Sequence, residues 1–346
     1  MTGNAYRILI VGHGSIGQRH LRIIRNNMPS SKIMVLRHSV TCLKVEYADI
    51  VSASFDDVRA FRPQIAVVAN PTSLHTEIAE LLIDLDCHLL IEKPLSNSLE
   101  DAMRLVKIAA SKSLVFQVGY NLRYLPSLRT FRDAILCGMV GSPNLVRSEV
   151  GQYLPDWRPT VDYRLSVTAN ESLGGGVLNE LSHDIDYLYW IFGMPAWVTG
   201  WTGRVGDLEV DSEDTALVGV GFRSTTREGP IVASLNMDFL RMDATRVCTV
   251  IGTNGTLTWD AKKNSVKFFD PTLGEWRTIH EQPVEPDFTY VEQWIDFMRC
   301  VEERSTPLVP LGEALDVVKI ISMVRSSANF GSKIAVSRGG ASERLV

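Results

Sequence analysis

The chain has 346 residues, of which 45% are hydrophobic and 22% are charged, and its formal net charge is −5. This balance is typical of a globular protein with two domains, and the acidic excess argues against nucleic-acid binding. No apolar run approaches the roughly 18 residues that span a membrane, and no signal-peptide pattern opens the chain, so we expect a cytoplasmic protein without a membrane partner.

The first 120 residues alternate short apolar runs with longer amphipathic segments. The apolar runs predict strands at 7–11, 33–36, 65–69, 88–91 and 114–118. Helical periodicity predicts helices at 15–27, 72–86 and 99–110. Continuous apolar strands that alternate with helices indicate an α/β fold, a doubly wound parallel sheet covered on both faces.

The pattern changes after residue 121, where we place the boundary between domains 1–121 and 122–346. Helices are predicted at 126–136, 178–192, 287–303 and 312–329. Strands are predicted at 144–153, 216–222, 231–237, 246–251, 255–259 and 266–269. Short strands separated by turn residues favour an α+β domain with an open, mostly antiparallel sheet.

A glycine-rich turn follows the first predicted strand and opens the first helix. Gly12, Gly14 and Gly17 form GxGxxG, with Ser15 and Ile16 inside it. The first glycine permits the tight turn, the second lets the backbone approach a pyrophosphate, and the third permits close packing of helix and strand. The helix N-terminus adds N–H donors for phosphate. These five residues therefore predict a dinucleotide site of the Rossmann type, with a purely structural turn as the alternative.

The residues after the second strand predict the choice of cofactor. An acidic residue there would accept a hydrogen bond from the ribose 2′-hydroxyl of NAD, whereas arginine would pair with the 2′-phosphate of NADP. The chain has Arg37, His38 and Ser39 at this point. We therefore favour NADP over NAD, with adenine stacking or simple solvation of Arg37 as the alternatives.

Further motifs point to one family. Glu92-Lys93-Pro94 follows a strand, Asn70-Pro71 precedes His75, and the segment 174–178 (GGGVL) precedes His183. With GxGxxG and the segment 118–124, this series resembles the glucose–fructose oxidoreductase and inositol dehydrogenase family (Gfo/Idh/MocA). The resemblance implies an NAD(P)-dependent oxidoreductase acting on a CH–OH group of a sugar, sugar acid, nucleotide sugar or cyclitol. It also implies cofactor contacts at Asn70, Pro71, His75, Glu92 and Lys93.

The same resemblance implies that domain 122–346 binds the substrate and forms homodimers or homotetramers through its sheet. Lys93 and His183 match the positions that relatives use for proton transfer and substrate orientation. The chemistry agrees, because Lys93 follows a strand at the sheet edge where ligands of open α/β folds bind. Pro94 is expected to follow a cis bond. The alternatives are a surface lysine and a structural histidine.

The chain departs from the family pattern beside His183. Relatives commonly have an aspartate four residues earlier, where this chain has Asn179, followed by Glu180. Asparagine cannot transfer a proton, but it can hydrogen-bond a substrate hydroxyl. Glu180 either replaces the missing acid or only supports the cluster.

Residues suited to an anionic sugar lie in segments expected to face the substrate. Aromatic side chains stack on sugar rings, and arginine pairs with carboxylate or phosphate. The candidates are Tyr120, Arg123, Trp157, Arg158 and Arg164. An ordinary solvated loop is the alternative.

Neither metal nor disulfide chemistry is expected. The five cysteines, Cys42, Cys87, Cys137, Cys248 and Cys300, form no CxxC motif, and no HxH or HExxH motif occurs. Two other functions stay open, namely a non-catalytic sensor of dinucleotide and sugar, and a dehydrogenase of another small ring such as a dihydrodiol, cyclic imine or lactone.

Overall fold

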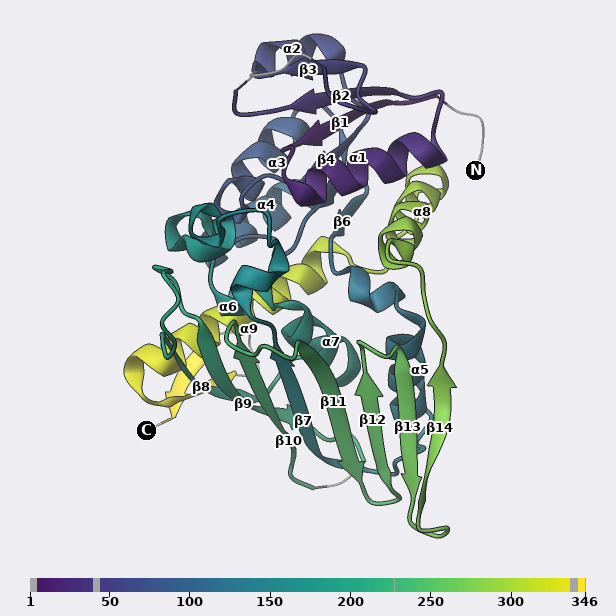
Figure 1. Ribbon diagram of the computed structural model, residues 1–346, viewed down its shortest axis with the longest axis vertical. Helices are drawn as coiled ribbons and strands as arrows, with labels where there is room; N and C mark the ends of the chain where they lie inside the picture. Colours follow the sequence, from purple (N-terminus) through teal and green to yellow (C-terminus); the bar gives the residue numbers. More distant parts are fainter. Residues whose placement is uncertain (1–4, 40–43, 227, 337–341, 346) are drawn as a thin grey trace. The chain divides into compact units, whose positions relative to one another are not determined.

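β1 (Arg7–Val11) lies inside a six-stranded parallel sheet in the order β3-β2-β1-β4-β5-β6 (Figure 1). The other strands are β2 (Lys32–Leu36), β3 (Ile50–Ser52), β4 (Ile65–Val68), β5 (His88–Ile91) and β6 (Phe116–Val118). This is the strand order of a dinucleotide-binding fold. The computed structural model describes residues 5–39, 44–226, 228–336 and 342–345, and it divides into two units.

The helices of the first unit come from both ends of the chain. They are α1 (Ser15–Asn27), α2 (Phe55–Phe61), α3 (His75–Ile83), α4 (Leu99–Ala109), α8 (Phe288–Glu303) and the start of α9 (Leu311–Phe330). Trp294, Phe297 and Met298 of α8 are buried in one core with Leu21 and Ile24 of α1. Large apolar side chains therefore hold α8 on this unit.

The domain ranges expected from the sequence differ from the structure at one place. The first unit comprises 1–121 together with 287–318, and the second comprises 122–286 and 319–346. The cut after residue 121 lies where the sequence pattern places it. The segment 287–318 was expected in the second domain, but the buried aromatic face of α8 packs with the first unit.

The second unit is built on a ten-stranded sheet in the order β14-β13-β12-β11-β7-β10-β9-β8-β15-β16. Its strands are β7 (Pro143–Gly151), β8 (Trp197–Gly203), β9 (Thr215–Arg223), β10 (Pro230–Asp238), β11 (Thr245–Gly252), β12 (Thr256–Asp260), β13 (Ser265–Asp270), β14 (Glu275–Glu281), β15 (Lys333–Val336) and β16 (Ser342–Leu345). Only β7 and β10 pair in parallel among the named pairs. The expected open, mostly antiparallel sheet is confirmed.

The second unit also contains helices that come from the middle of the chain. They include α5 (Pro126–Leu136), α6 (Val177–Glu180) and α7 (His183–Phe192), with α5 and α7 behind the strands in Figure 1. The sequence predicted one helix over 178–192, but the chain turns at Leu181 and Ser182, so that His183 begins a new helix. The sequence analysis also missed β3 and α2, which are too short for a periodic signal.

Cys87, Cys137, Cys248 and Cys300 are free, while Cys42 lies outside the described residues. Across residues 5–39, 44–226, 228–336 and 342–345, no group of three His, Cys, Asp or Glu side chains could hold a metal. Within the same residues, no helix combines the length and the apolar character that a membrane span requires.

Candidate functional site

The glycine-rich turn connects β1 to α1 in the first unit. Gly12 has φ +90°, and a Cβ there would lie 2.6 Å from the carbonyl oxygen of Ala69. A Cβ at Gly17 would collide with the carbonyl oxygen of Gly12. Both positions therefore require glycine for reasons of backbone packing.

Gly14 differs from these two glycines because, beyond its chain neighbours and the backbone of its own helix, no atom of the described residues lies within 4 Å of its ideal Cβ position. It is the N-cap of α1, has no side-chain cap, and is followed by Ser15 and Ile16 in a first turn without acidic residues. The helix N-terminus therefore presents backbone N–H groups beside open space, which suits a pyrophosphate. The turn fits the dinucleotide that the sequence motif implies.

The carboxyl end of β2 carries the residues expected to read the ribose. The Arg37 N–H donates to the Ser52 carbonyl at 2.9 Å, and His38 and Ser39 are exposed. Partial burial and, second, the positive charge of Arg37 lower the pKa of His13 in the glycine-rich turn. The backbone of Arg37 is thus fixed beside β3, and its positive charge acts on His13 of the glycine-rich turn.

The loops after β4 and β5 are joined by His75. Its side chain is 1% exposed, with Nδ1 3.0 Å from the Pro94 carbonyl oxygen and Nε2 3.0 Å from that of Asn70. Burial lowers the pKa of His75, although the two backbone hydrogen bonds act to raise it. The side-chain oxygen of Asn70 is buried and has no hydrogen-bond partner within the described residues. His75 thus connects the loop after β4 to the loop after β5. Asn70, which precedes Pro71, has a side-chain oxygen that could accept a hydrogen bond from a ligand.

Glu92, Lys93 and Pro94 follow β5. The Glu92 carboxylate is buried, with Oε1 2.6 Å from Nε2 of His20 and Oε2 accepting the Lys93 N–H at 3.3 Å. Burial opposes the charge of Glu92, but the hydrogen bond and charge of His20, then Lys93, outweigh it and lower the pKa of Glu92. The Lys93–Pro94 bond is cis, as expected.

His20 is the site-supporting residue that the sequence analysis missed. It lies on the buried face of α1 with Gly17, Leu21 and Ile24. A fully buried histidine on an apolar helix face needs a polar partner, and that requirement was the available signal. The Glu92 carboxylate therefore points into the protein interior. There it contacts His20 and fixes the backbone N–H of Lys93.

In the second unit, His183 is the first residue of α7 and is 9% exposed. The side chain of Asn179 is 2% exposed, and its Nδ2 donates to the Gly174 carbonyl at 2.9 Å and to the Gly175 carbonyl at 3.5 Å. A carboxylate could not donate these hydrogen bonds. The departure from the family pattern therefore has a structural role in the glycine turn, while Glu180 ends α6 and is partly exposed.

Arg123 was expected to contact the substrate, but the structure engages its charge elsewhere. Its side chain is fully buried, with Nε 3.0 Å and Nη2 2.7 Å from the two carboxylate oxygens of Asp186. Its guanidinium also lies 5.4 Å from the ring centroid of Trp190. Because both partners are buried, the pair neutralises itself and leaves no charge for an anionic ligand. Tyr120, in the first unit, is likewise fully buried.

The remaining substrate candidates lie in the exposed loop after β7. Trp157 is partly buried, donates to the Gln152 carbonyl at 3.1 Å and packs edge-on against Phe239. Arg164 is exposed and paired with Asp162 and Glu209. Arg158 is exposed and has no ion-pair partner within the part of the chain that the structure describes. Of the two exposed arginines, Arg158 is therefore the better candidate for an anion.

The chain is similar in sequence and in fold to known dehydrogenases. The chain is 27% identical over 199 residues to inositol 2-dehydrogenase of Rubrobacter xylanophilus, covering 55% of this chain and 54% of that protein, so it spans about half the length of this relative. A solved levoglucosan dehydrogenase in complex with NADH has a TM-score of 0.84 at 18% identity, covering 96% of this chain and 100% of that one. The WlbA dehydrogenase of Bordetella pertussis, in complex with NADH and UDP-GlcNAcA, has a TM-score of 0.80 at 21% identity, covering 96% and 99%.

Two family matches span most of the chain. Residues 6–120 match the family described as "Oxidoreductase family, NAD-binding Rossmann fold". Residues 128–258 match the "GFO/IDH/MocA C-terminal domain". The dinucleotide-binding order of the first sheet and the open glycine-rich turn agree with the first of these descriptions. The chain belongs to the Gfo/Idh/MocA family of oxidoreductases, with an NAD-binding Rossmann fold in its first unit.

Proposed function

We propose that this protein is a nicotinamide-dependent dehydrogenase or reductase that acts on a secondary alcohol or ketone of a sugar-like substrate. The observation that carries the proposal is the support of Lys93 in the first unit. Lys93 follows the carboxyl end of β5, and the buried carboxylate of Glu92 accepts its backbone N–H. The glycine-rich turn follows the carboxyl end of the nearby β1, at the same edge of the same sheet. Ligands of open α/β sheets bind at this edge.

The proposed roles follow from the chemistry of alcohol oxidation. When bound, the nicotinamide supplies a two-electron acceptor for the hydride that leaves the alcohol carbon. The oxygen on that carbon must lose its hydroxyl proton as the carbonyl group forms. We assign the acceptance of this proton to Nζ of Lys93. We assign substrate orientation to the imidazole of His183, in the second unit, whose ring nitrogens can hydrogen-bond a hydroxyl group. In the reductive direction the proton moves back from Lys93 to the substrate oxygen.

We propose that Arg37 makes the protein prefer NADP over NAD. The family description names NAD, and the two solved neighbours were determined with NADH. Support for NADP comes from this chain alone, because Arg37, His38 and Ser39 follow β2 where an acidic residue would favour NAD.

We propose the cytoplasm as the compartment in which the protein acts.

An anionic sugar is the proposed substrate class. The exposed guanidinium of Arg158 supports an anionic ligand, whereas Arg123 is already paired within the second unit. The WlbA dehydrogenase, which has a similar fold, was determined in complex with UDP-GlcNAcA.

A homo-oligomer through the open face of the second sheet is also proposed. We call Leu145, Trp201, Leu217 and Val232 the open-face cluster, since they are 41%, 46%, 50% and 36% exposed. Trp201 pairs with Leu217 across β8 and β9, and Val232 pairs with Leu145 across β10 and β7. Exposed apolar side chains in register on one sheet face favour burial against a second copy.

The test of the proposed activity is a spectroscopic substrate screen. Purified protein would be mixed with NAD, NADP, NADH or NADPH and a panel of sugars, sugar acids, nucleotide sugars, cyclitols, dihydrodiols and cyclic imines, and the absorbance of the reduced nicotinamide followed. We expect turnover with a sugar-like substrate that is lost in Lys93→Gln and retained in Lys107→Gln, an exposed lysine of α4. Binding of dinucleotide and sugar without turnover would instead identify a non-catalytic sensor.

A further inference from the structure

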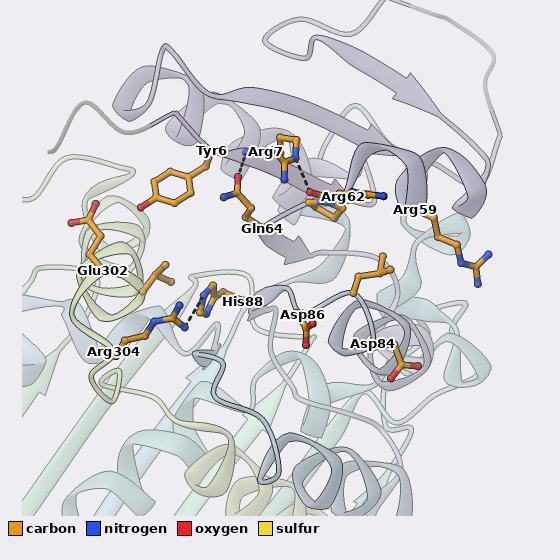
Figure 2. Close-up of a pocket in the computed structure, with 13 residues that line it drawn as sticks. Tyr6, Arg7, Arg59, Arg62, Gln64, Asp84, Asp86, His88, Glu302 and Arg304 are labelled. Carbon is orange, nitrogen blue, oxygen red and sulfur yellow. Dashed lines mark hydrogen bonds between the residues drawn. The ribbon is translucent and has the colours of Figure 1, made fainter.

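A hollow of about 880 Å³ opens in the first unit at the amino edge of its parallel sheet (Figure 2). Its lining includes Arg7 at the start of β1, Gln64 just before β4, and His88 at the start of β5, together with Arg304, which caps the end of α8. The glycine-rich turn and Lys93 follow the carboxyl ends of the same strands. We call it the amino-edge hollow, and it is separate from the dinucleotide site.

The protonation of His88 follows from its neighbours. Its Nδ1 accepts the backbone N–H of Val115 at 2.9 Å, so this nitrogen carries a lone pair and no proton. Burial and, second, the charge of Arg304 lower the pKa of His88 to about 4. The ring is therefore neutral near pH 7, and its single proton is on Nε2.

This tautomer places two donors face to face. Nη1 of Arg304 lies 3.2 Å from Nε2 of His88 and also donates to the Ser113 carbonyl at 3.0 Å. An arginine N–H cannot donate to a nitrogen that already carries a proton. Within the described residues, the Nε2–H of His88 has no acceptor, although the side chain is only 8% exposed. Figure 2 shows the two side chains directed toward each other at the base of the hollow.

Further positive charge lies along the rim. Nε of Arg7 donates to the Arg62 carbonyl at 2.8 Å, which places both arginines on one side of the hollow. The guanidinium of Arg62 has no hydrogen bond or ion pair within residues 5–39, 44–226, 228–336 and 342–345. Three acidic residues, Asp84, Asp86 and Glu302, also line the hollow. A ligand that combines an oxyanion with hydroxyl groups would match both kinds of lining.

We propose that the amino-edge hollow binds the oxyanion of a small hydroxylated metabolite, a phosphate or a carboxylate, between Nε2–H of His88 and the guanidinium of Arg304. One oxygen of the ligand would accept a hydrogen bond from each of the two N–H groups, which otherwise face each other without an acceptor. Charge-assisted hydrogen bonds between a guanidinium and an oxyanion are stronger than those between neutral groups.

The proposal is tested by calorimetric titration of the full-length protein at pH 7. Saturating NADH is present throughout, so that the glycine-rich turn cannot bind the probes. The probes are inorganic phosphate, malonate and glucose 6-phosphate. We expect saturable binding of at least one probe. Tighter binding of phosphate than of malonate would identify a phosphate site, and tighter binding of glucose 6-phosphate than of phosphate would show that the hydroxylated part also contributes.

Two variants and one control define the site. Arg304→Gln removes the charge, and His88→Asn keeps an acceptor for the Val115 N–H while removing the Nε2 donor. Each should weaken binding at least about tenfold. Arg104→Gln, which removes an exposed arginine of α4 outside the hollow, should change it less than about twofold.

A second measurement is independent of how the variants fold. Nitrogen NMR of the wild-type imidazoles should show a proton on Nε2 of His88, and this signal should move as the probe is added. No binding of any probe, equal binding by all variants, or a proton on Nδ1 would each overturn the proposal.

Discussion

Nε2 of His20 lies 2.6 Å from Oε1 of Glu92, and both side chains are buried in the first unit. The pair joins the middle of α1 to the residue that follows β5. The other carboxylate oxygen of Glu92 accepts the N–H of Lys93, so the same group ties α1 to the backbone of the proposed proton-transfer residue. The glycine-rich turn begins α1, and both parts of the proposed cofactor edge are therefore held by one buried contact.

Replacing His20 by leucine should leave the carboxylate of Glu92 buried without this partner. We expect the free energy of unfolding to fall by about 3–5 kcal/mol, the usual cost of leaving a buried charge without its partner. Arg59→Gln, which removes an exposed ion pair with Asp56, should cost less than about 1 kcal/mol. Urea unfolding of the three proteins measures both values, and equal losses would contradict the assigned role.

The same pair predicts a dependence of stability on acid. Because the pKa of Glu92 is lowered below its ordinary value of 4.5 in the folded protein, the unfolded chain binds a proton more readily there. The contribution of Glu92 is therefore fully present above about pH 4.5 and is lost as pH falls through the lower folded value. Urea unfolding across this range should show a smaller acid loss in Glu92→Gln than in the wild type. An identical pH profile would argue against a stabilising carboxylate.

Replacing Arg37 by aspartate should reverse the cofactor preference. The new carboxylate would repel a 2′-phosphate and accept from a 2′-hydroxyl, so we expect KM for NADP to rise and KM for NAD to fall, each by about tenfold. Arg37→Gln is the matched control, which should lose NADP use without gaining NAD use. A wild-type KM for NAD equal to or below that for NADP would refute the proposed preference.

Much of the fold was accessible from the sequence because its signals are local. Apolar runs predicted the strands of the first sheet except β3, and the GxGxxG spacing located the turn between β1 and α1. The return of α8 to the first unit could not be deduced, since its apolar face is compatible with either domain. The contact of His20 with Glu92 was also hidden, because it joins residues 72 positions apart.

The substrate candidates show a further limit of sequence reasoning. An arginine next to a family motif has the same appearance in sequence whether it is exposed, as Arg158 is, or buried against a carboxylate, as Arg123 is. Asp186 lies 63 positions from Arg123, and only the fold brings them together. Asn179 was similarly ambiguous, because its amide could serve either a ligand or the backbone of the glycine turn.

Lys93 and His183 should affect turnover in different ways if one transfers the proton and the other orients the substrate. Lys93→Gln is expected to lower kcat at least about 100-fold, as for loss of a proton-transfer group, with NADH binding changed less than about threefold. His183→Asn should lower kcat/KM, and the double variant should lose less than the product of the single losses. Steady-state kinetics and NADH fluorescence measure these quantities. Strictly multiplicative losses would indicate independent roles.

Introducing a charge into the open-face cluster should prevent self-association. Leu217 is 50% exposed and pairs with Trp201 across β8 and β9, so Leu217→Asp would place a carboxylate in the proposed interface. We expect light scattering after gel filtration to show an oligomer for the wild type and a monomer for the variant. Leu273→Asp, at another exposed leucine in the turn between β13 and β14, should keep the wild-type mass. A monomeric wild type would refute the proposal.

Replacing Asn179 by aspartate should destabilise the second unit at neutral pH. The Nδ2 group donates to the carbonyl oxygens of Gly174 and Gly175, and a buried carboxylate would face these oxygens without a proton. The expected loss is about 1–3 kcal/mol, the cost of unsatisfied buried polar groups. Because the protonated carboxyl can donate, its folded pKa should be raised, and the loss should shrink as pH falls through that value.

Asn170→Asp is the matched control for this variant. The side-chain oxygen of Asn170 accepts from the Ser172 N–H at 3.0 Å and from its hydroxyl at 2.8 Å, and a carboxylate oxygen can accept both bonds. Its stability should therefore remain within about 0.5 kcal/mol of the wild type. Urea unfolding of both variants at neutral and acidic pH separates the two cases. Equal stability of Asn179→Asp and the wild type at neutral pH would show that the amide is not needed by the glycine turn and is available to a ligand.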